Sequence, residues 1–213
     1  PPRSTLFPYT TLFRSVSGPA GVGKGTINQT LIERNSDIHM SVSATTRAPR
    51  VGEINGVHYF FKSEDEFKQM IDQGAFLEYM HVFDMHYYGT PKSFVEQELQ
   101  EGRSVILEID VHGAMRVKAA YPDAVLIFIA PPSMSELKSR LIHRGTESTE
   151  AIERRFETAY EELEYVKQYD YVVVNDILDL AIARTEQIIA AERCRVYRNG
   201  ELIEKLQGGR NAI

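Results

Sequence analysis

The chain has 213 residues, of which 43% are hydrophobic and 25% charged, a composition typical of one α/β domain that buries a hydrophobic core. A net charge of −6 argues against a nucleic-acid partner, and no apolar run is long enough to span a membrane, so we expect neither partner. The single cysteine, Cys194, excludes an internal disulfide and fits a reducing, cytoplasmic location, while the six histidines show no zinc-binding spacing.

Residues 1–14 form an atypical N-terminal segment. The sequence PPRSTLFPYTTLFRS at residues 1–15 contains TLF twice and no acidic residue, and it lacks the clear basic amphipathic face of a transit peptide. We favour a foreign or mis-translated segment, with native sequence as the alternative, and expect the folded domain to span residues 15–213. Arg14 interrupts the strand expected before Ser17. We expect it to lie at the margin of this strand or, if it is buried without a partner, to weaken the fold.

Beyond residue 15 the pattern alternates between strands and helices. Helices are predicted over residues 27–35, 63–74, 133–145, 149–169 and 177–193, and buried strands over residues 105–110, 124–130 and 171–175. Ser63 and Glu66 have the spacing of a capping box. Strands joined by helical crossovers predict a parallel, doubly wound α/β sheet, whose ligands bind beyond the carboxyl ends of the strands. This rule places residues 17–24, Asp110 and Asn175 around one cleft.

The sequence GPAGVGK at residues 18–24 matches the phosphate-binding pattern G-x-x-x-x-G-K. Such a loop turns successive backbone N–H groups toward an anion at the positive end of the following helix. The alternative is a glycine-rich turn that only joins a strand to a helix. The residues predicted to bind the phosphates of ATP are Gly18, Pro19, Ala20, Gly21, Val22, Gly23, Lys24, Gly25 and Thr26.

Gly25 stands where a serine or threonine usually binds magnesium in such loops. We therefore expect Mg²⁺ to be held mainly by phosphate oxygens and water, with Thr26 as the one candidate ligand from the protein.

A second phosphate site is predicted from Arg47, Arg50 and Tyr59. Two guanidinium groups and a phenol hydroxyl can hold a phosphate through charge-assisted hydrogen bonds. Alone, two arginines in a polar loop are usually only solvated. Together with the loop at residues 18–26, they indicate phosphoryl transfer between two nucleotides.

Four motifs in this order resemble the guanylate kinase family: SVSATTRAPRVGE (41–53), YYGTP (87–91), LEIDVHGA (107–114) and HRGTES (143–148). The resemblance covers roughly residues 15–195. It implies a P-loop kinase core at residues 15–42 and 91–213, a GMP-binding subdomain at residues 43–90, and a short lid at about residues 143–157. The family usually has glutamine where this chain has His112.

The resemblance also implies roles for individual residues, with ATP as co-substrate. Asn175 would lie near the adenine of ATP, and the catalytic residues would be Lys24, Arg140, Arg144 and Arg155. Helix-face salt bridges are the alternative for any one of these arginines. The residues that would contact GMP are Ser43, Arg47, Arg50, Tyr59, Glu78, Tyr88, Thr90 and Asp110.

The chemistry of guanine agrees with the roles given to Glu78 and Thr90. A carboxylate can accept both N1–H and N2–H₂ of guanine, and a hydroxyl can donate to O6. Adenine has no N1–H and would leave a buried carboxylate unpaired, which costs about 1–3 kcal/mol.

Three functions remain open from the sequence. The first is a magnesium-dependent kinase that converts ATP and GMP (or dGMP) to ADP and GDP. The second is a non-catalytic guanylate-kinase-like domain that binds protein partners, although such domains typically lack an intact phosphate loop. The third is a kinase for another nucleoside monophosphate, which Glu78 and Thr90 disfavour.

Overall fold

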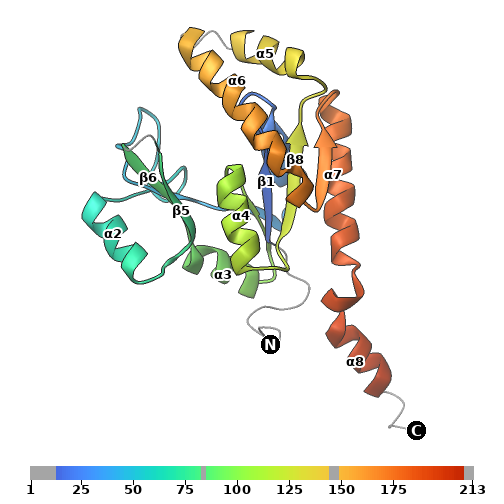
Figure 1. The fold of residues 1–213 in the computed structure, drawn as a ribbon. Helices are drawn as coiled ribbons and strands as arrows, with labels where there is room; N and C mark the ends of the chain where they lie inside the picture. The colour runs from blue at the N-terminus through green and yellow to red at the C-terminus, as the bar shows by residue number, and fades with distance from the viewer. Residues whose placement is uncertain (1–12, 83–84, 144–148, 209–213) are drawn as a thin grey trace.

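The computed structural model describes residues 13–82, 85–143 and 149–208. Within these residues, a central sheet of five parallel strands has the order β2-β7-β1-β8-β9 (Figure 1). Its strands are β1 (Phe13–Ser17), β2 (Ile38–Met40), β7 (Ser104–Leu107), β8 (Val125–Ala130) and β9 (Tyr171–Val174). The predicted parallel, doubly wound α/β sheet is confirmed.

Helices cover both faces of this sheet. On one face, Ile27 and Ile182 pack with Val16 of β1 in one buried cluster. On the other, Leu99 and Val117 pack with Leu107 of β7. Because both faces are buried, the central strands are nearly continuous runs of apolar residues. The helices are α1 (Lys24–Arg34), α3 (Lys92–Gln100), α4 (Val111–Ala120), α5 (Met134–His143), α6 (Thr149–Glu164) and α7 (Leu178–Arg193).

A second, smaller sheet stands to one side of the core (Figure 1). Its order is β4-β3-β6-β5, with β3 (Ala44–Thr45), β4 (Phe60–Phe61), β5 (Phe76–Val82) and β6 (His86–Pro91). Helix α2 (Glu64–Asp72) covers it, and Phe67 of α2 stacks on Phe76 at a ring distance of 4.4 Å. The predicted capping box between Ser63 and Glu66 is confirmed at the start of α2.

Three short helical elements complete the described chain, and the last of them, α8, extends away from the core (Figure 1). The 3₁₀ helix η1 (Tyr165–Gln168) precedes β9, and η2 (Val196–Arg198) and α8 (Gly200–Gly208) follow α7. Among the residues that the structure describes, no helix combines the length and the apolar character that crossing a membrane requires.

Arg14 lies inside β1, where it is opposite Ile106 on one side and Val125 on the other. It pairs with both neighbouring strands and its side chain is 0% exposed, so the first expectation, a place at the strand margin, is wrong, and the second, a weakened fold, stays a prediction. All three guanidinium nitrogens are buried and make no hydrogen bond to the described residues. Burial is the largest cause that lowers the pKa of Arg14 to about 9; Arg193 and Arg198 lower it further, whereas Asp37 and Glu192 oppose the shift. The side chain is still charged at neutral pH, so its burial opposes folding.

Arg14→Val should stabilise the protein, because it replaces an unpaired buried charge with a residue that suits a central strand. We expect the free energy of unfolding to rise by about 2 kcal/mol and Tm to rise by roughly 5 °C. Thermal and urea unfolding measure both quantities. Arg34→Leu is the control for replacing an arginine by an apolar residue. Arg34 is the last residue of α1, and its side chain is 48% exposed. A stability gain no larger than that of the control would contradict the assigned cost of Arg14.

Candidate functional site

The turn between β1 and α1 lies at the carboxyl edge of the central sheet. Gly18 and Gly23 have φ angles of 140° and 97°, which favour glycine. A Cβ atom on Gly18 would lie 2.2 Å from the backbone oxygen of Ile129, so a larger residue cannot fit there. The turn therefore stays close to the sheet and leads directly into α1, the arrangement in which backbone N–H groups and the helix dipole attract a phosphate.

Asn175 fixes this turn from the end of β9. Its side-chain Nδ2 donates to the backbone oxygen of Val22 at 2.8 Å, and a Cβ atom on Gly23 would lie 2.5 Å from the same nitrogen. Arg140 of α5 in turn donates to the backbone oxygen of Asn175 at 3.1 Å. Asn175 thus lies beside residues 17–24, as the sequence predicted, whereas the cleft that they would share with Asp110 and the contact of Asn175 with ATP stay predictions.

Lys24 begins α1 and folds back over the turn. Its Nζ donates to the backbone oxygens of Gly18 and, at 3.1 Å, of Pro19. Glu162 of α6 interacts electrostatically with Lys24, and burial raises the pKa of the Glu162 carboxyl. Glu162 was missed by the sequence interpretation, because nothing in the pattern of α6 distinguishes it from the helix's solvated glutamates.

A magnesium ion near this turn would meet oxygen donors of the right kind. Asn28 is fully buried in α1 and donates to Oε2 of Glu108 at 2.9 Å, and Oε1 of Glu108 lies 3.9 Å from the position of a Cβ on Gly25. Thr26 lies exposed in the first turn of α1. Among the described residues, no group of three or more His, Cys, Asp and Glu could hold a metal. The donors thus fit an ion that keeps its water and phosphate ligands.

The second predicted phosphate site carries its own counter-charge. Arg47 donates from Nη2 to Oε1 of Glu53 at 2.8 Å, and the backbone N–H of Arg50 donates to Oε2 of the same carboxylate at 2.7 Å. The hydrogen bond from Arg47 is the largest cause that lowers the pKa of Glu53 to about 2. A bound phosphate would compete with Glu53 for these two donors. The sequence interpretation missed Glu53, although it follows Arg50 by three residues.

Two tyrosines surround Arg47. Its guanidinium carbon lies 5.5 Å from the ring centre of Tyr59, and the rings of Tyr59 and Tyr88 meet edge to face at 6.0 Å. Burial is the largest cause that raises the pKa of Tyr59, so its hydroxyl is a neutral hydrogen-bond donor at pH 7. The structure thus places Arg47, Tyr59 and Tyr88 together.

Glu78 and Thr90 face each other across β5 and β6. They are ladder partners, and Thr90 Oγ1 donates to Glu78 Oε1 at 2.8 Å. Both side chains are buried, which is unusual for a carboxylate in a small sheet. Asp110 caps α4 by accepting from the N–H of Gly113 at 2.7 Å and adds negative charge near Glu78.

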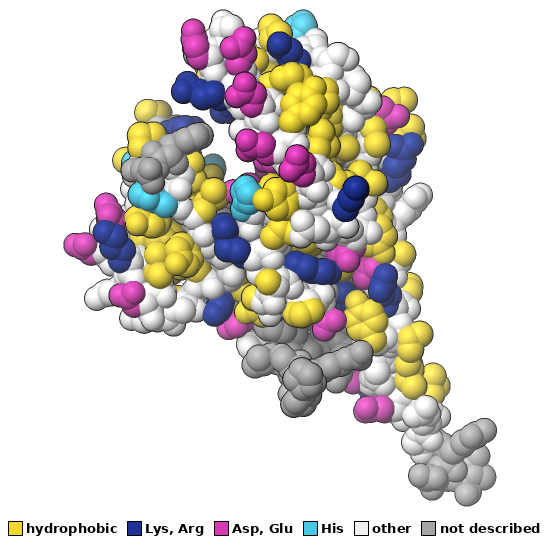
Figure 2. Space-filling model, in the orientation of Figure 1, with side chains coloured by type: hydrophobic (Ala, Val, Ile, Leu, Met, Phe, Trp, Pro, Cys, Tyr) yellow, Lys and Arg dark blue, Asp and Glu magenta, His cyan; other side chains and the backbone are white. Residues whose placement is uncertain are grey.

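The structure describes some of the remaining predicted residues. Ser43 precedes β3 and is partly exposed, and Arg155 is exposed on α6. Arg144 lies outside the described residues. His112 packs edge-on against Tyr165 at a ring distance of 5.1 Å, so it contacts the start of η1. Figure 2 shows a hollow between the lobe of the second sheet and α6, which carries a row of acidic side chains.

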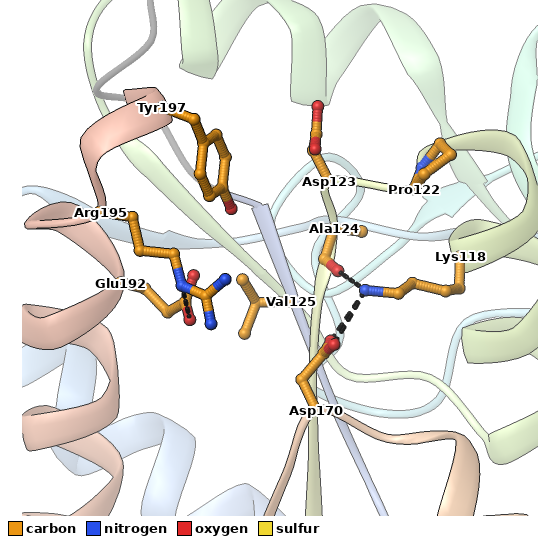
Figure 3. Close-up of a pocket in the computed structure, with 9 residues that line it drawn as sticks. All are labelled: Lys118, Pro122, Asp123, Ala124, Val125, Asp170, Glu192, Arg195 and Tyr197. Atoms are coloured by element: carbon orange, nitrogen blue, oxygen red, sulfur yellow. Dashed lines mark hydrogen bonds and ion pairs between the residues drawn. The ribbon is translucent and has the colours of Figure 1, made fainter. Parts of the chain in front are cut away.

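A separate cavity of about 250 Å³ lies at the opposite, amino-terminal edge of the sheet (Figure 3). Four of its charged side chains form two ion pairs: Lys118 bonds to Asp170 at 2.9 Å, and Arg195 bonds to Glu192 at 3.0 Å. This cavity is remote from the turn at residues 18–23, because β8 begins beside it and ends beside the turn. Asp123 and Tyr197 also line the cavity.

Comparison with known proteins identifies close relatives. The family model described as guanylate kinase matches residues 14–192. The guanylate kinase of Caldanaerobacter subterraneus subsp. tengcongensis is 57% identical over 192 residues, which are 90% of this chain and 93% of the relative. That of Clostridium perfringens (strain SM101) is 55% identical over 183 residues, 86% and 84% of the two chains. The crystal structure of guanylate kinase from Anaplasma phagocytophilum superposes with a TM-score of 0.72 at 31% identity, covering 91% and 92%.

Gly23→Ala should disable the turn, because the added Cβ meets Asn175 Nδ2 at 2.5 Å. Gly102→Ala is the matched control, since Gly102 also has a positive φ, of 79°, but no atom lies within 4 Å of its Cβ position. Both variants should lose about 1 kcal/mol of stability from backbone strain. Only Gly23→Ala should also lose binding of a nucleoside triphosphate, by about 10-fold or more in calorimetry. Equal triphosphate affinities in the two variants would show that the contact with Asn175 does not shape the turn.

Proposed function

The chain belongs to the guanylate kinase family, and we propose that it transfers the γ-phosphoryl group of ATP to GMP or dGMP, giving ADP and GDP or dGDP. It is a nucleoside monophosphate kinase. The observation that carries the proposal is the pairing of an intact phosphate-binding turn with the buried Glu78–Thr90 pair, in a chain 57% identical to a guanylate kinase.

Positive charge from the protein would act on the moving phosphoryl group. In such transfers the protein supplies position and electrostatic stabilisation and takes little part in covalent chemistry. Lys24 begins the helix next to the turn and would reach the β- and γ-phosphates once these replace its contacts with Gly18 and Pro19. Arg140 and the predicted lid residues Arg144 and Arg155 would add charge and exclude water.

Magnesium, when bound with ATP, would neutralise the β- and γ-phosphate oxygens. The chain would contribute Glu108 and Thr26 near the first turn of α1, with Asn28 holding the Glu108 carboxylate in place at 2.9 Å. The proposal keeps the sequence expectation that phosphate and water are the main ligands and adds Glu108 as a donor that can orient those waters.

The acceptor nucleotide would lie between the second sheet and the core. Arg47, Arg50, Tyr59 and Tyr88 would hold its phosphate, with Glu53 released from the guanidinium of Arg47 as the phosphate binds. The carboxylate of Glu78 would accept N1–H and N2–H₂ of guanine. Thr90 donates its one hydroxyl proton to Glu78 Oε1 in the structure and would turn that proton to O6 as the base binds. A base without these donors leaves Glu78 buried and unpaired, which is the source of discrimination.

A non-catalytic protein-binding domain is the alternative, and it is not favoured. Gly18, Gly23 and Lys24 retain the geometry and contacts of a phosphate-binding turn, which a domain that only binds proteins does not need.

A coupled assay of ADP release tests the function directly. With ATP and magnesium, GMP and dGMP should be phosphorylated, whereas kcat/KM for AMP and UMP should be lower by about 100-fold or more. Comparable kcat/KM for AMP would contradict the guanine assignment. No turnover with any of the four acceptors, in protein shown to be folded by circular dichroism, would favour the non-catalytic alternative.

Two substitutions should separate the two phosphate sites. Lys24→Met should lower kcat by about 100- to 1000-fold, because it removes charge from the transition state. Arg47→Met should chiefly raise KM for GMP, by about 10-fold or more, because it removes a charge-assisted bond to the acceptor phosphate. Lys205→Met, on the exposed surface of α8, is the control and should leave both constants unchanged. Wild-type kinetics in Lys24→Met and Arg47→Met would refute both roles.

A further inference from the structure

Glu78 has a cationic neighbour that the proposed chemistry has not yet used. Arg116, on α4, places Nη2 3.8 Å from Glu78 Oε2, the carboxylate oxygen that Thr90 does not occupy. The side chain of Glu78 is 5% exposed and that of Arg116 is 45% exposed, so a charge at the protein surface reaches inward to a buried carboxylate.

Helix α4 is shaped for this approach. Gly113 lies one turn before Arg116, and a Cβ at Gly113 would be 3.1 Å from Glu78 Oε2. Residues three apart lie on the same side of a helix. The side of α4 that carries Gly113 and Arg116 therefore faces Glu78, with glycine leaving room for the carboxylate and arginine supplying its counter-charge.

The groups around Glu78 act in opposite directions on its ionisation. Burial is the largest effect and raises the pKa of the Glu78 carboxyl, and Asp110 at the start of α4 raises it further. The hydrogen bond from Thr90 and the charge of Arg116 lower it. Arg116 is thus the cation that opposes burial and Asp110.

We propose that Arg116 is a positioning residue that keeps Glu78 charged and aimed at the base, so that its two oxygens accept from the acceptor nucleotide. The proposal rests on the proposed function, in which Glu78 reads guanine. Only the ionised carboxylate can accept both N1–H and N2–H₂, because a protonated carboxyl has turned one acceptor into a donor. Arg116 consequently sets the lower end of the pH range in which GMP binds tightly.

The sign of the expected pH effect follows from these directions. Glu78 must be deprotonated to bind guanine, so KM for GMP rises as the pH falls through the pKa of Glu78. Removing Arg116 takes away a cause that lowers this pKa, so the rise begins at a higher pH. A neighbouring cation lowers the pKa of a carboxyl group by about 1 to 3. Because Arg116 is partly exposed to solvent, we expect a shift near 1.

The experiment compares wild-type enzyme with Arg116→Met and Arg116→Lys between pH 5.5 and 8.5. The phosphate of GMP titrates near pH 6, so the quantity plotted is the ratio of KM for GMP in each variant to that of wild type. For Arg116→Met this ratio should be near 1 at pH 8.5 and rise steadily toward the acidic end, with about 10 as the ceiling for a shift of one pH unit, and with kcat and KM for ATP unchanged. Arg116→Lys should restore most of the wild-type profile.

Two controls make the outcomes separable. Lys205→Met removes an exposed charge on α8 and should leave the ratio near 1 at every pH. Glu78→Gln should raise KM for GMP by about 10-fold or more with little pH dependence. If Glu78→Gln leaves KM unchanged, the guanine-reading role itself fails. If Glu78→Gln acts but the ratio for Arg116→Met is flat with pH, at 1 or at any higher value, Glu78 keeps its role and the inference about Arg116 is overturned.

Discussion

The backbone of Gly18 packs so closely against β8 that a Cβ atom would lie 2.2 Å from the carbonyl oxygen of Ile129, and Gly23 is nearly as close to Asn175. These two approaches determine where the first turn of α1 begins, because the chain between them has little freedom. Asn175 links the turn to β9, and Arg140 links Asn175 to α5. The positive end of α1 is therefore aligned with the carboxyl edge of the sheet, where the predicted lid also attaches. A phosphate bound there would contact a turn that is held to both β8 and β9.

The protein combines two proposed phosphate sites with a net charge of −6. The structure shows how sites for anions can exist on a protein with a net negative charge. The guanidinium of Arg47 is bonded to Glu53, and the backbone of Arg50 is bonded to the same carboxylate. Lys24 is directed at backbone oxygens and interacts with Glu162. Each site thus keeps its cation in position with a local acceptor that a phosphate can replace. Preorganisation of this kind reduces the ordering that binding would otherwise require.

The sequence predicted the features that depend on neighbouring residues. The phosphate-binding turn, the capping box at Ser63 and the buried strands at residues 105–110 and 124–130 all follow from local patterns, and their boundaries differ from the observed ones by a few residues at most. The pairs that complete the site join distant residues and have no local signal. Asn28 and Glu108 are 80 positions apart, and Arg116 meets Glu78 only because α4 packs beside β5. Strands β2, β3, β5 and β6 and helices α3, α4 and α8 were not predicted. Strands β2 and β3 have only three and two residues, which are too few to carry a periodic pattern.

Arg14 and Glu78 show why the burial of a charge does not by itself indicate function. Both side chains are almost wholly enclosed, and in both the pKa is displaced in the direction that favours the neutral form, first of all by burial. Glu78 accepts a hydrogen bond from Thr90 and lies near the cation of Arg116, and these partners offset the cost of burying its charge. Thr90 bonds only to Oε1, so Oε2 can still accept from a ligand. Arg14 makes no hydrogen bond to the described residues, and Arg193 and Arg198 add repulsion. A charge that is partnered and adjoins a hollow is what a binding site requires, whereas an unpartnered charge within a central strand only lowers stability. By this criterion, whether a buried charge has partners, Arg14 contributes nothing to the site at the end of β1.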